Sequence, residues 1–385
     1  MFSLSGLEKM AKVVHWGKYY PPDMGGIESV TSSVARGAQA AGHSVSVVCF
    51  RKGEAPDDGA SDGVRVLRAP IQMLKASQPM GLRYFRWLLE EGRGADLIHL
   101  HAPNLLASLA AAMLGRGPRL VIHWHSDIVD KGLIGKLVKP LEGAMLRRAD
   151  RIVCTSEAYA KASLPLAPYT DKISVVPIGV ADVAPPRSED LIPEELARRI
   201  RGRRIILAIG RLVPYKGFPV LIDAAPHFQG DAVVVIVGTG PRKAELEAQI
   251  NQGGLADKVI LAGRQEDSAL RALFRQAALF CLPSVERSEA FGVVLIEAMS
   301  HGLPIVATQI PGSGVSWVNA HGESGINVPV ADPRALVEAC NELLASGELR
   351  EKFARGARLR FETEFTEQVS TERMMKVYSG LLAGS

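Results

Sequence analysis

The stretch RIILAIGRLVPYKGFPVLIDAA, residues 204–225, contains one complete unit of the predicted fold. It begins with a mostly apolar run at 204–209, continues through a loop bounded by Gly210 and Gly217, and ends in an amphipathic segment at 218–225. A short apolar strand followed by a glycine-containing loop and a helix is typical of a parallel sheet with helices on both faces. The stretch therefore predicts an α/β fold.

The same alternation runs along the whole chain. Strands are predicted at 12–16, 44–50, 64–68, 97–101, 120–125, 151–155 and 173–176, and then at 204–209, 232–237, 259–262, 279–282, 304–307 and 325–328. Helices are predicted at 27–41, 133–148, 218–225, 242–252, 267–277, 291–301, 333–345 and 368–383. Two groups of strands predict two doubly wound, Rossmann-like domains that face each other across a cleft, with ligands at the carboxyl ends of the strands.

The segment 177–201 separates the two groups of strands. It is rich in proline and has little periodicity, so we predict that it is the interdomain linker. We expect an N-terminal domain at 1–183, a C-terminal domain at 184–365 and a final helix at 366–385. That helix has apolar residues at helical spacing, and we expect it to pack back on the N-terminal domain.

Composition excludes several classes of protein. Hydrophobic residues make up 47% and charged residues 22% of the 385 residues, which fits neither a disordered chain nor a coiled coil. No apolar run approaches the roughly 18 residues of a membrane span. Glu8, Lys9 and Lys12 interrupt the N-terminal segment where a signal peptide is apolar, so we expect a cytoplasmic protein. The four cysteines are widely separated and are predicted to be buried free thiols.

The charge is unevenly distributed. Residues 1–180 hold 22 Lys and Arg against 16 Asp and Glu, and residues 181–385 hold 23 against 25. A basic first half can attract nucleic acid, anionic lipid or a phosphorylated substrate, but it lacks the dense basic blocks of a nucleic-acid binder. The segments 74–93 and 131–139 mix basic and apolar residues. They fit either a surface that lies on anionic lipid or ordinary helices with a solvated face.

Gly25 and Gly26 stand between the first predicted strand and the first helix. Adjacent glycines allow a ligand to approach the backbone, and a helix start offers free N–H groups to a phosphate. A flexible turn capped by Asp23 is an equally good interpretation of this motif.

Histidines gather at the ends of two successive predicted strands, where His99 and His101, then His123 and His125, are followed by Asp127. We expect one histidine of each pair to be buried and the other to point into the cleft. A zinc site is a weaker interpretation, because no cysteine lies nearby. His125 is the best cleft candidate, since an imidazole there can exchange a hydrogen bond with a substrate hydroxyl near pH 7. His101 and Asp127 are candidates on the acceptor side.

Arg211 and Lys216 lie in the loop after the first strand of the second domain. A planar guanidinium and a compact ammonium on one loop can clamp a diphosphate and replace a divalent metal. A solvated basic loop is the alternative for such a pair, but the position at a strand end favours a function.

Glu289 and Glu297 interrupt the otherwise apolar stretch SEAFGVVLIE at 288–297. Burying an unpaired carboxylate costs several kcal/mol, so two such residues suggest ligands for hydroxyl groups.

The chain has no D-x-D triplet to hold a metal and a nucleotide diphosphate, no G-x4-G-K-[ST] loop and no G-x-G-x-x-G loop. Kinase-type and ordinary NAD-dependent activities are therefore disfavoured.

Taken together, these motifs resemble retaining glycosyltransferases of the GT-B fold, in the family called glycosyl transferases group 1. The resemblance rests on KYYPPDMGGIE at 18–28, HAPN at 101–104, VIHWHSDIV at 121–129, RADRIVCTS at 148–156, VVPIGV at 175–180, AIGRLVPYKGF at 208–218, IVGTGP at 236–241, VILAGR at 259–264 and LPSVERSEAFGVVLIEAMSHGLPIVAT at 282–308. It covers nearly the whole chain.

The resemblance implies roles for individual residues. Arg211 and Lys216 would neutralise the diphosphate leaving group, Glu297 would bind the ribose, Glu289 would contact the donor sugar's 3- and 4-hydroxyls, and His125 would lie near the anomeric centre. The catalytic candidates are therefore His125, Arg211, Lys216 and Glu289. The further donor-binding candidates are Gly25, Gly26, Gly210, Gly238, Phe291, Gly292, Val293, Val294 and Glu297. No metal or cofactor is expected.

The sequence departs from the family where many members carry a G-G-x-x-E turn, because PGSGVSWVN stands here at 311–319. HWHSDIV and SGVSWVN are similar to a subgroup that transfers mannose or rhamnose in bacterial surface polysaccharide assembly. The resemblance thus implies a GDP-linked sugar donor and a glycan acceptor. If the basic and apolar segments 74–93 and 131–139 lie on anionic lipid, they could reach a polyprenyl-diphosphate-linked acceptor. A sugar-nucleotide epimerase, a phosphorylase or a catalytically silent donor-binding subunit would have the same architecture.

Overall fold

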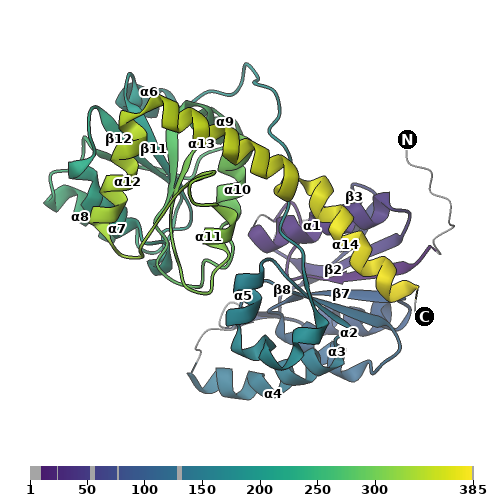
Figure 1. The fold of residues 1–385 in the computed structure, drawn as a ribbon. Helices are drawn as coiled ribbons and strands as arrows, with labels where there is room; N and C mark the ends of the chain where they lie inside the picture. Colours follow the sequence, from purple (N-terminus) through teal and green to yellow (C-terminus); the bar gives the residue numbers. More distant parts are fainter. Residues whose placement is uncertain (1–9, 24, 53–56, 76–77, 128–131, 384–385) are drawn as a thin grey trace, which may run out of the picture. The chain divides into compact units, whose positions relative to one another are not determined.

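The computed structural model describes residues 10–23, 25–52, 57–75, 78–127 and 132–383, with only the backbone described at 132–138. The chain divides into two compact units, Met1–Gly179 with Glu367–Ser385, and Val180–Thr366. The structure therefore changes unit within four residues of the predicted boundary at 183. Each unit is a Rossmann-like α/β domain (Figure 1), which confirms the predicted fold class.

Unit 1 is built on an eight-stranded sheet in the order β10-β9-β8-β7-β1-β2-β4-β3. Every pairing is parallel except the one between β3 and β4. The strands are β1 (Lys12–Trp16), β2 (Ser44–Arg51), β3 (Asp58–Ser61), β4 (Val64–Pro70), β7 (Leu97–Ala102), β8 (Arg119–Trp124), β9 (Arg151–Cys154) and β10 (Ile173–Val175). The helices are α1 (Gly26–Ala40), α2 (Leu82–Arg93), α3 (Leu105–Met113), α4 (Gly132–Arg148), α5 (Glu157–Ala162) and α14 (Glu367–Leu382).

The strand order reverses next to β1. The chain proceeds from β1 to β2 and β4 on one side and then returns to place β7 on the other side of β1. Such a switch point leaves a gap between the loops at the carboxyl ends of β1 and β7, and ligands of doubly wound folds bind there. The loop after β1 leads to Gly25 and Gly26, and β7 carries His99 and His101.

Unit 2 has a six-stranded, fully parallel sheet in the order β13-β12-β11-β14-β15-β16. The strands are β11 (Arg204–Ile209), β12 (Ala232–Val237), β13 (Val259–Gly263), β14 (Ala277–Leu282), β15 (Ile305–Thr308) and β16 (Gly325–Val328). The helices are α6 (Glu194–Ile200), α7 (Phe218–Ala224), α8 (Lys243–Gln252), α9 (Asp267–Gln276), α10 (Val293–Ser300), α11 (Val315–Val318), α12 (Pro333–Ala345) and α13 (Gly347–Arg360). Its switch point lies between β11 and β14.

The C-terminal helix α14 belongs to unit 1 and packs against α1 (Figure 1). Its buried residues are Ser370, Met374 and Tyr378, spaced four apart along one face. At the start of the helix, Arg36 Nη2 lies 2.9 Å from Glu367 Oε1. The apolar spacing of the sequence thus pointed to a packed helix, although one of its three buried residues, Ser370, is polar.

Several short elements were not predicted from the sequence. They are β3, the hairpin of β5 (Met73–Lys75) and β6 (Gln78–Met80), α2, α3, α5, α6 and α11, and the longer helix α13 was not predicted either. Helix α6 lies inside the predicted linker 177–201, so that segment is only partly a linker. The polar strand β3 and the almost uniformly apolar helix α3 have no amphipathic period that would reveal them.

Helix α2 occupies most of the segment 74–93. It buries Tyr84, Leu88 and Gly92 on one face and exposes Leu82, Arg83 and Arg86 on the other. The buried face belongs to the core, and the exposed face mixes basic and apolar residues, so both interpretations of this segment stay open. In the segment 131–139, Lys131 lies outside the described residues.

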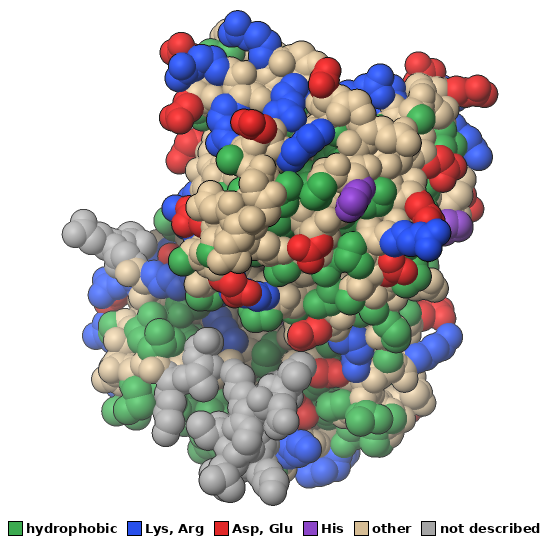
Figure 2. Space-filling model, turned by 90° about the vertical axis from the view of Figure 1, so that its left-hand side faces the viewer, with side chains coloured by type: hydrophobic (Ala, Val, Ile, Leu, Met, Phe, Trp, Pro, Cys, Tyr) green, Lys and Arg blue, Asp and Glu red, His purple; other side chains and the backbone are tan. Residues whose placement is uncertain are grey.

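The composition predicts buried free cysteines and a surface without dense basic blocks. All four cysteines are buried and free, as predicted. In Figure 2, basic and acidic side chains stand close together over most of the visible face, as expected for a chain without dense basic blocks. Among the described residues, no helix is both long and apolar enough to cross a membrane.

Candidate functional site

The loop after β11 brings both predicted cations to the switch point of unit 2. Arg211 is exposed, whereas Lys216 lies at the end of a short 3-10 turn, Pro214–Lys216, and is buried. The side chain of Lys216 lies over Gly210, so that a Cβ at Gly210 would come within 3.0 Å of its Cε. The loop thus presents one exposed cation, which has no ion pair among the described residues, and one cation held against the fold.

Lys216 forms a buried ion pair with Glu289. Its Nζ lies 2.6 Å from Glu289 Oε2, and both side chains are only 10% exposed. The hydroxyl of Ser284, which follows β14, donates to the same carboxylate oxygen at 2.9 Å. Sequence reasoning proposed both residues as site candidates but did not pair them, because they belong to loops at two different strand ends.

Gly217 allows these two loops to meet. Its φ is +65°, and a Cβ there would lie 1.9 Å from the carbonyl oxygen of Pro283. Next to it, the N–H of Val285 donates to the carbonyl of Tyr215 at 2.8 Å. A side chain at Gly217 would force the loop of Lys216 away from the loop of Glu289.

Gly238 supports the loop from behind. It follows β12 with a φ of +143°, and a Cβ there would lie 2.0 Å from the carbonyl oxygen of Gly210. The structure therefore places Gly210 and Gly238 together, with Gly238 behind the loop that carries Lys216.

The segment that departs from the family pattern holds the Glu289 turn. The hydroxyl of Ser313 donates to the backbone carbonyl of Glu289, and the N–H of Gly314 donates to the carbonyl of Ala290 at 2.8 Å. Phe291 is buried, with its ring 6.1 Å from that of Trp317. The segment 311–319 thus fixes the backbone around Glu289 from a second loop.

Helix α10 begins beside this ion pair. Gly292 precedes it with a φ of +80°, and no side chain caps its first turn. The backbone N–H groups of Val293 and Val294 lie in this first turn and have no intrahelical acceptor. A helix start of this kind attracts an anion.

Glu297 differs from its sequence-based prediction. It is exposed rather than buried, and it lies little more than one turn into α10 because the helix begins at Val293 and not at 291. Desolvation by the surrounding protein raises the pKa of Glu297 to about 7, partly offset by the nearby Lys216 charge. The residue as a whole lies at the surface of the unit, while its carboxylate is desolvated by the neighbouring protein.

In unit 1, Gly25 and Gly26 lie where α1 begins. Gly25 is the residue before the helix, no side chain caps that end, and both glycines are exposed. Glu28 is acidic in the first turn. The Glu28 carboxylate lies over Gly25, with Oε2 2.2 Å from where a Cβ would stand, so in this structure an acidic side chain occupies the position where an anion would bind.

The histidine cluster is larger and more deeply buried than expected. His99, His101, His123 and His125 are all at least 92% buried, and His15 of β1 joins them. One histidine of each pair was expected to be buried and the other to point into a cleft. Both members of each pair are buried, so the second half of that prediction is wrong. Alternate residues of adjacent strands share one face, so the strand order β8-β7-β1 stacks all five rings.

Hydrogen bonds order the rings into two chains. One runs from His125 Nε2 to His101 Nδ1 at 3.0 Å, and from His101 Nε2 to His15 Nδ1 at 3.2 Å. The other joins His123 Nδ1 to His99 Nε2 at 3.3 Å and His99 Nδ1 to the Tyr378 hydroxyl at 2.6 Å. Burial lowers the pKa of His15 and His123 to about 3, and that of the other three well below 6.5, so the rings are neutral.

The hydrogen bonds among the histidine rings use nitrogens that a zinc ion would need as ligands. Ring nitrogens of His99, His101 and His123 lie within 4.8 Å of one another. Both nitrogens of His99 and of His101 are engaged, and the Nε2 atoms of His15 and His123 are buried with no hydrogen-bond partner among the described residues. A metal would have to break the hydrogen bonds that order the rings.

The two acceptor-side candidates are engaged by the fold. His101 is 1% exposed and both of its nitrogens are bonded, so it cannot touch an acceptor directly. Asp127 accepts from Trp124 Nε1 at 2.9 Å and from the Ser163 hydroxyl at 2.6 Å. Both residues support the region around His125 rather than offering free groups.

The comparisons with known proteins match both units of the chain. A family model described as glycosyl transferases group 1 matches residues 195–360, and one described as glycosyl transferase 4-like domain matches residues 25–179. O-antigen chain mannosyltransferase C of Escherichia coli is 32% identical over 372 residues, covering 96% of this chain and 99% of the relative. D-rhamnosyltransferase WbpZ of Pseudomonas aeruginosa is 33% identical over 357 residues, covering 92% of each chain.

A solved structure supports the fold alone. The Anabaena protein HepE in complex with UDP-glucose superposes with a TM-score of 0.75 at 19% identity, covering 96% of this chain and 100% of that one.

Proposed function

The chain belongs to the group 1 family of glycosyltransferases, and on that premise we propose that it is a retaining hexosyltransferase that uses a GDP-linked donor. We propose that it transfers mannose or rhamnose to a hydroxyl of a glycan or lipid-linked glycan in cell-surface polysaccharide assembly. The donor sugar follows the two relatives, which transfer mannose and D-rhamnose by name. The N-terminal unit would bind the acceptor and the C-terminal unit the donor.

The observation that carries this proposal is the Lys216–Glu289 pair beside the start of α10. Unit 2 holds three features close together here. They are the buried Lys216, 2.6 Å from the Glu289 carboxylate, the exposed cation Arg211, and the start of α10 at Val293, whose N-cap residue makes no side-chain hydrogen bond. A nucleotide diphosphate sugar needs these three features: positive charge for the phosphates, backbone N–H groups for their oxygens, and a carboxylate for sugar hydroxyls.

In this mechanism the cations act on the leaving group. As the bond from the anomeric carbon to the diphosphate breaks, negative charge grows on the phosphate oxygens, and Lys216 and Arg211 stabilise it more than the ground state. The acceptor oxygen bonds to the anomeric carbon on the same face, and its proton passes to the departing phosphate. No carboxylate nucleophile is needed, which fits retention by a front-face route.

Glu289 has two functions in this proposal. It accepts hydrogen bonds from the donor's 3- and 4-hydroxyls and keeps Lys216 at the phosphate side of the loop. The carboxylate of Glu297 would accept from the ribose hydroxyls. His125 is only 8% exposed and its Nε2 is bonded to His101 Nδ1, so in this proposal it supports the neighbouring loop and does not contact the sugar itself.

The proposal is tested by incubating the purified chain with GDP-, UDP-, ADP- and dTDP-sugars in the presence and absence of EDTA. We expect slow, acceptor-free hydrolysis of GDP-mannose or GDP-rhamnose that EDTA leaves unchanged. Release of an epimer would indicate an epimerase, and tight donor binding without any turnover would indicate a silent subunit. Loss of activity on chelation with recovery on Mg²⁺ would contradict the metal-free clamp.

Association with a membrane belongs to the same proposal. Unit 1 provides the net basic charge, and a lipid-linked acceptor would bring that surface to anionic lipid. We expect the protein to co-sediment with anionic liposomes at low salt, and absence of binding under those conditions would argue against peripheral contact.

A further inference from the structure

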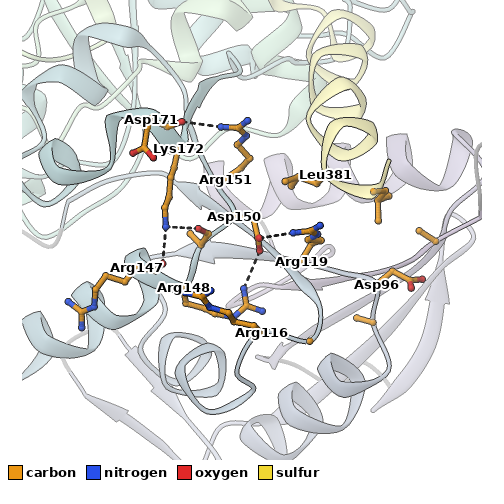
Figure 3. A pocket seen from close by; sticks show the side chains of 15 residues that line it. Asp96, Arg116, Arg119, Arg147, Arg148, Asp150, Arg151, Asp171, Lys172 and Leu381 are labelled. Carbon is orange, nitrogen blue, oxygen red and sulfur yellow. Dashed lines mark hydrogen bonds and ion pairs between the residues drawn. The ribbon is translucent and has the colours of Figure 1, made fainter. Parts of the chain in front are cut away.

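A basic hollow opens at the amino ends of the unit 1 strands, opposite to the carboxyl ends where Gly25 and His125 lie. It has a volume of about 910 Å³, within the roughly 300–1,000 Å³ of small-molecule sites. Its lining comes from the residues just before β1 and β7, from the starts of β8 and β9, from the end of α4 and from α14 (Figure 3). It is therefore separate from the candidate donor and acceptor sites.

The hollow contains more positive charge than its carboxylates neutralise. Its charged lining residues are the cations Arg116, Arg119, Arg147, Arg148, Arg151 and Lys172 and the acids Asp96, Asp150 and Asp171. Asp150 stands between Arg119 and Arg148, at 3.3 and 3.2 Å from their Nη1 atoms (Figure 3). The carboxylate of Asp96 accepts instead from the backbone N–H of Lys12 at 2.7 Å.

Four of the six cations have no carboxylate partner among the residues that the structure describes. Arg151 donates to the backbone carbonyl of Asp171 at 3.1 Å, and Lys172 to the carbonyls of Arg147 and Ala149 at 2.8 and 2.9 Å. These bonds engage only some of the N–H donors of each side chain and leave the charges uncompensated. The guanidinium groups of Arg116 and Arg147 form no ion pair in the described part of the chain.

Helix capping explains only some of these cations. Arg148 donates to the carbonyls of Gly115 and Pro118 and lies in the last turn of α4, where a cation offsets the helix dipole. Arg116 and Arg151 belong to the loop after α3 and to the first position of β9, and both are exposed. Desolvation by burial lowers the pKa of Arg148, and the nearby charges of Arg116 and Arg119 lower it further. The carboxylate of Asp150 raises it and offsets part of this effect.

We propose that this hollow is a binding site for a small molecule that carries a diphosphate or a longer phosphate chain. Guanidinium forks match phosphate oxygens two at a time, and a multivalent anion would offset the repulsion among cations that lack carboxylates. Arg116 and Arg151 supply the forks, and Lys172 adds a fixed charge. The site does not depend on the proposed transferase activity.

The test measures binding of inorganic pyrophosphate to the full chain by titration calorimetry. The variant Arg116→Ser with Arg151→Ser removes two exposed charges from the hollow, and the control Arg86→Ser with Arg334→Ser removes the same net charge from exposed sites elsewhere. We expect the hollow variant to bind at least tenfold more weakly, and the control to bind as the wild type does. Transferase activity should be unchanged in both.

A further arm separates this site from the donor site, which would also attract pyrophosphate. Arg211→Ala should leave the Arg116-dependent binding intact. If Arg211→Ala abolishes all binding and the hollow variant binds normally, or if no binding is found, the proposal is overturned. Binding to vesicles of phosphatidic acid that depends on Arg116 and Arg151, without binding of soluble pyrophosphate, would equally overturn it in favour of a lipid surface.

Discussion

Lys216 and Glu289 lie at the ends of neighbouring strands of unit 2, and their side chains form a buried ion pair with Nζ 2.6 Å from Oε2. The pair ties the cation of the β11 loop to the carboxylate that precedes α10. It has two separable effects, one on the stability of unit 2 and one on the proposed chemistry.

Lys216→Met should lower kcat by about 10²–10³, the usual effect of removing one group that stabilises developing negative charge. It should also destabilise unit 2, since removing one partner of a buried pair costs roughly 3–5 kcal/mol, and partial exposure puts this pair near the lower figure. Steady-state kinetics below the melting temperature, together with urea unfolding, measure the two effects.

The double variant Lys216→Met with Glu289→Gln serves as the control for this experiment. It leaves no unpaired charge, so it should recover part of the lost stability and none of the lost activity. Turnover near that of the wild type in Lys216→Met would contradict the proposed role of the lysine.

Arg211→Ala should reduce kcat by at least tenfold without changing the free energy of unfolding, because Arg211 is exposed and has no ion pair within the described residues. Arg334→Ala is the matched control, since its side chain is 89% exposed and lies on α12, away from the strand ends. Equal activity of the two variants would show that Arg211 does not act on the leaving group.

Sequence patterns were sufficient where structure is set locally. The β11 strand, its glycine-bounded loop and α7 follow from an apolar run, Gly217 and an amphipathic segment that are adjacent in the chain. The candidate cations were found for the same reason, because Arg211 and Lys216 lie on that one loop.

Tertiary relationships were not predictable in this way. The Lys216–Glu289 pair depends on β11 and β14 being neighbours, and the strand order is set by the packing of the whole sheet. His15 was missed because a single histidine in the apolar run KVVHW carries no signal until β1 is placed beside β7. Glu297 was expected to be buried because its sequence neighbours are apolar, but its own direction on α10 exposes it.

Gly217→Ala should destabilise the protein and reduce activity together. A Cβ there meets the Pro283 carbonyl at 1.9 Å, so the loop that carries Lys216 must move. Gly230→Ala is the matched control, because Gly230 has the same φ of +65° and nothing within 4 Å of its Cβ position. It should lose only about 1–2 kcal/mol from the left-handed backbone.

Thermal melts and kcat of the two glycine variants separate these effects. If Gly217→Ala behaves like Gly230→Ala in both measurements, the contact with Pro283 does not position the loop.

The buried histidines predict that unit 1 loses stability in mild acid. In the folded state burial lowers the pKa of His15 and His123 to about 3, and the pKa values of His99, His101 and His125 also lie well below 6.5. An unfolded chain binds protons at these rings below about pH 6.5, so it gains protons that the folded chain does not. Stability is therefore fully present above pH 6.5 and falls as the pH drops toward 3, by about 1.4 kcal/mol per pH unit for each proton.

Urea unfolding between pH 7.5 and 5.5, followed by the fluorescence of the buried Trp16 and Trp124, measures this slope. We expect an uptake of at least two protons on unfolding near pH 5.5. Replacing His15 by Phe should reduce the slope by about one proton. A stability that does not change over this range would mean that the five rings are not held neutral by the fold.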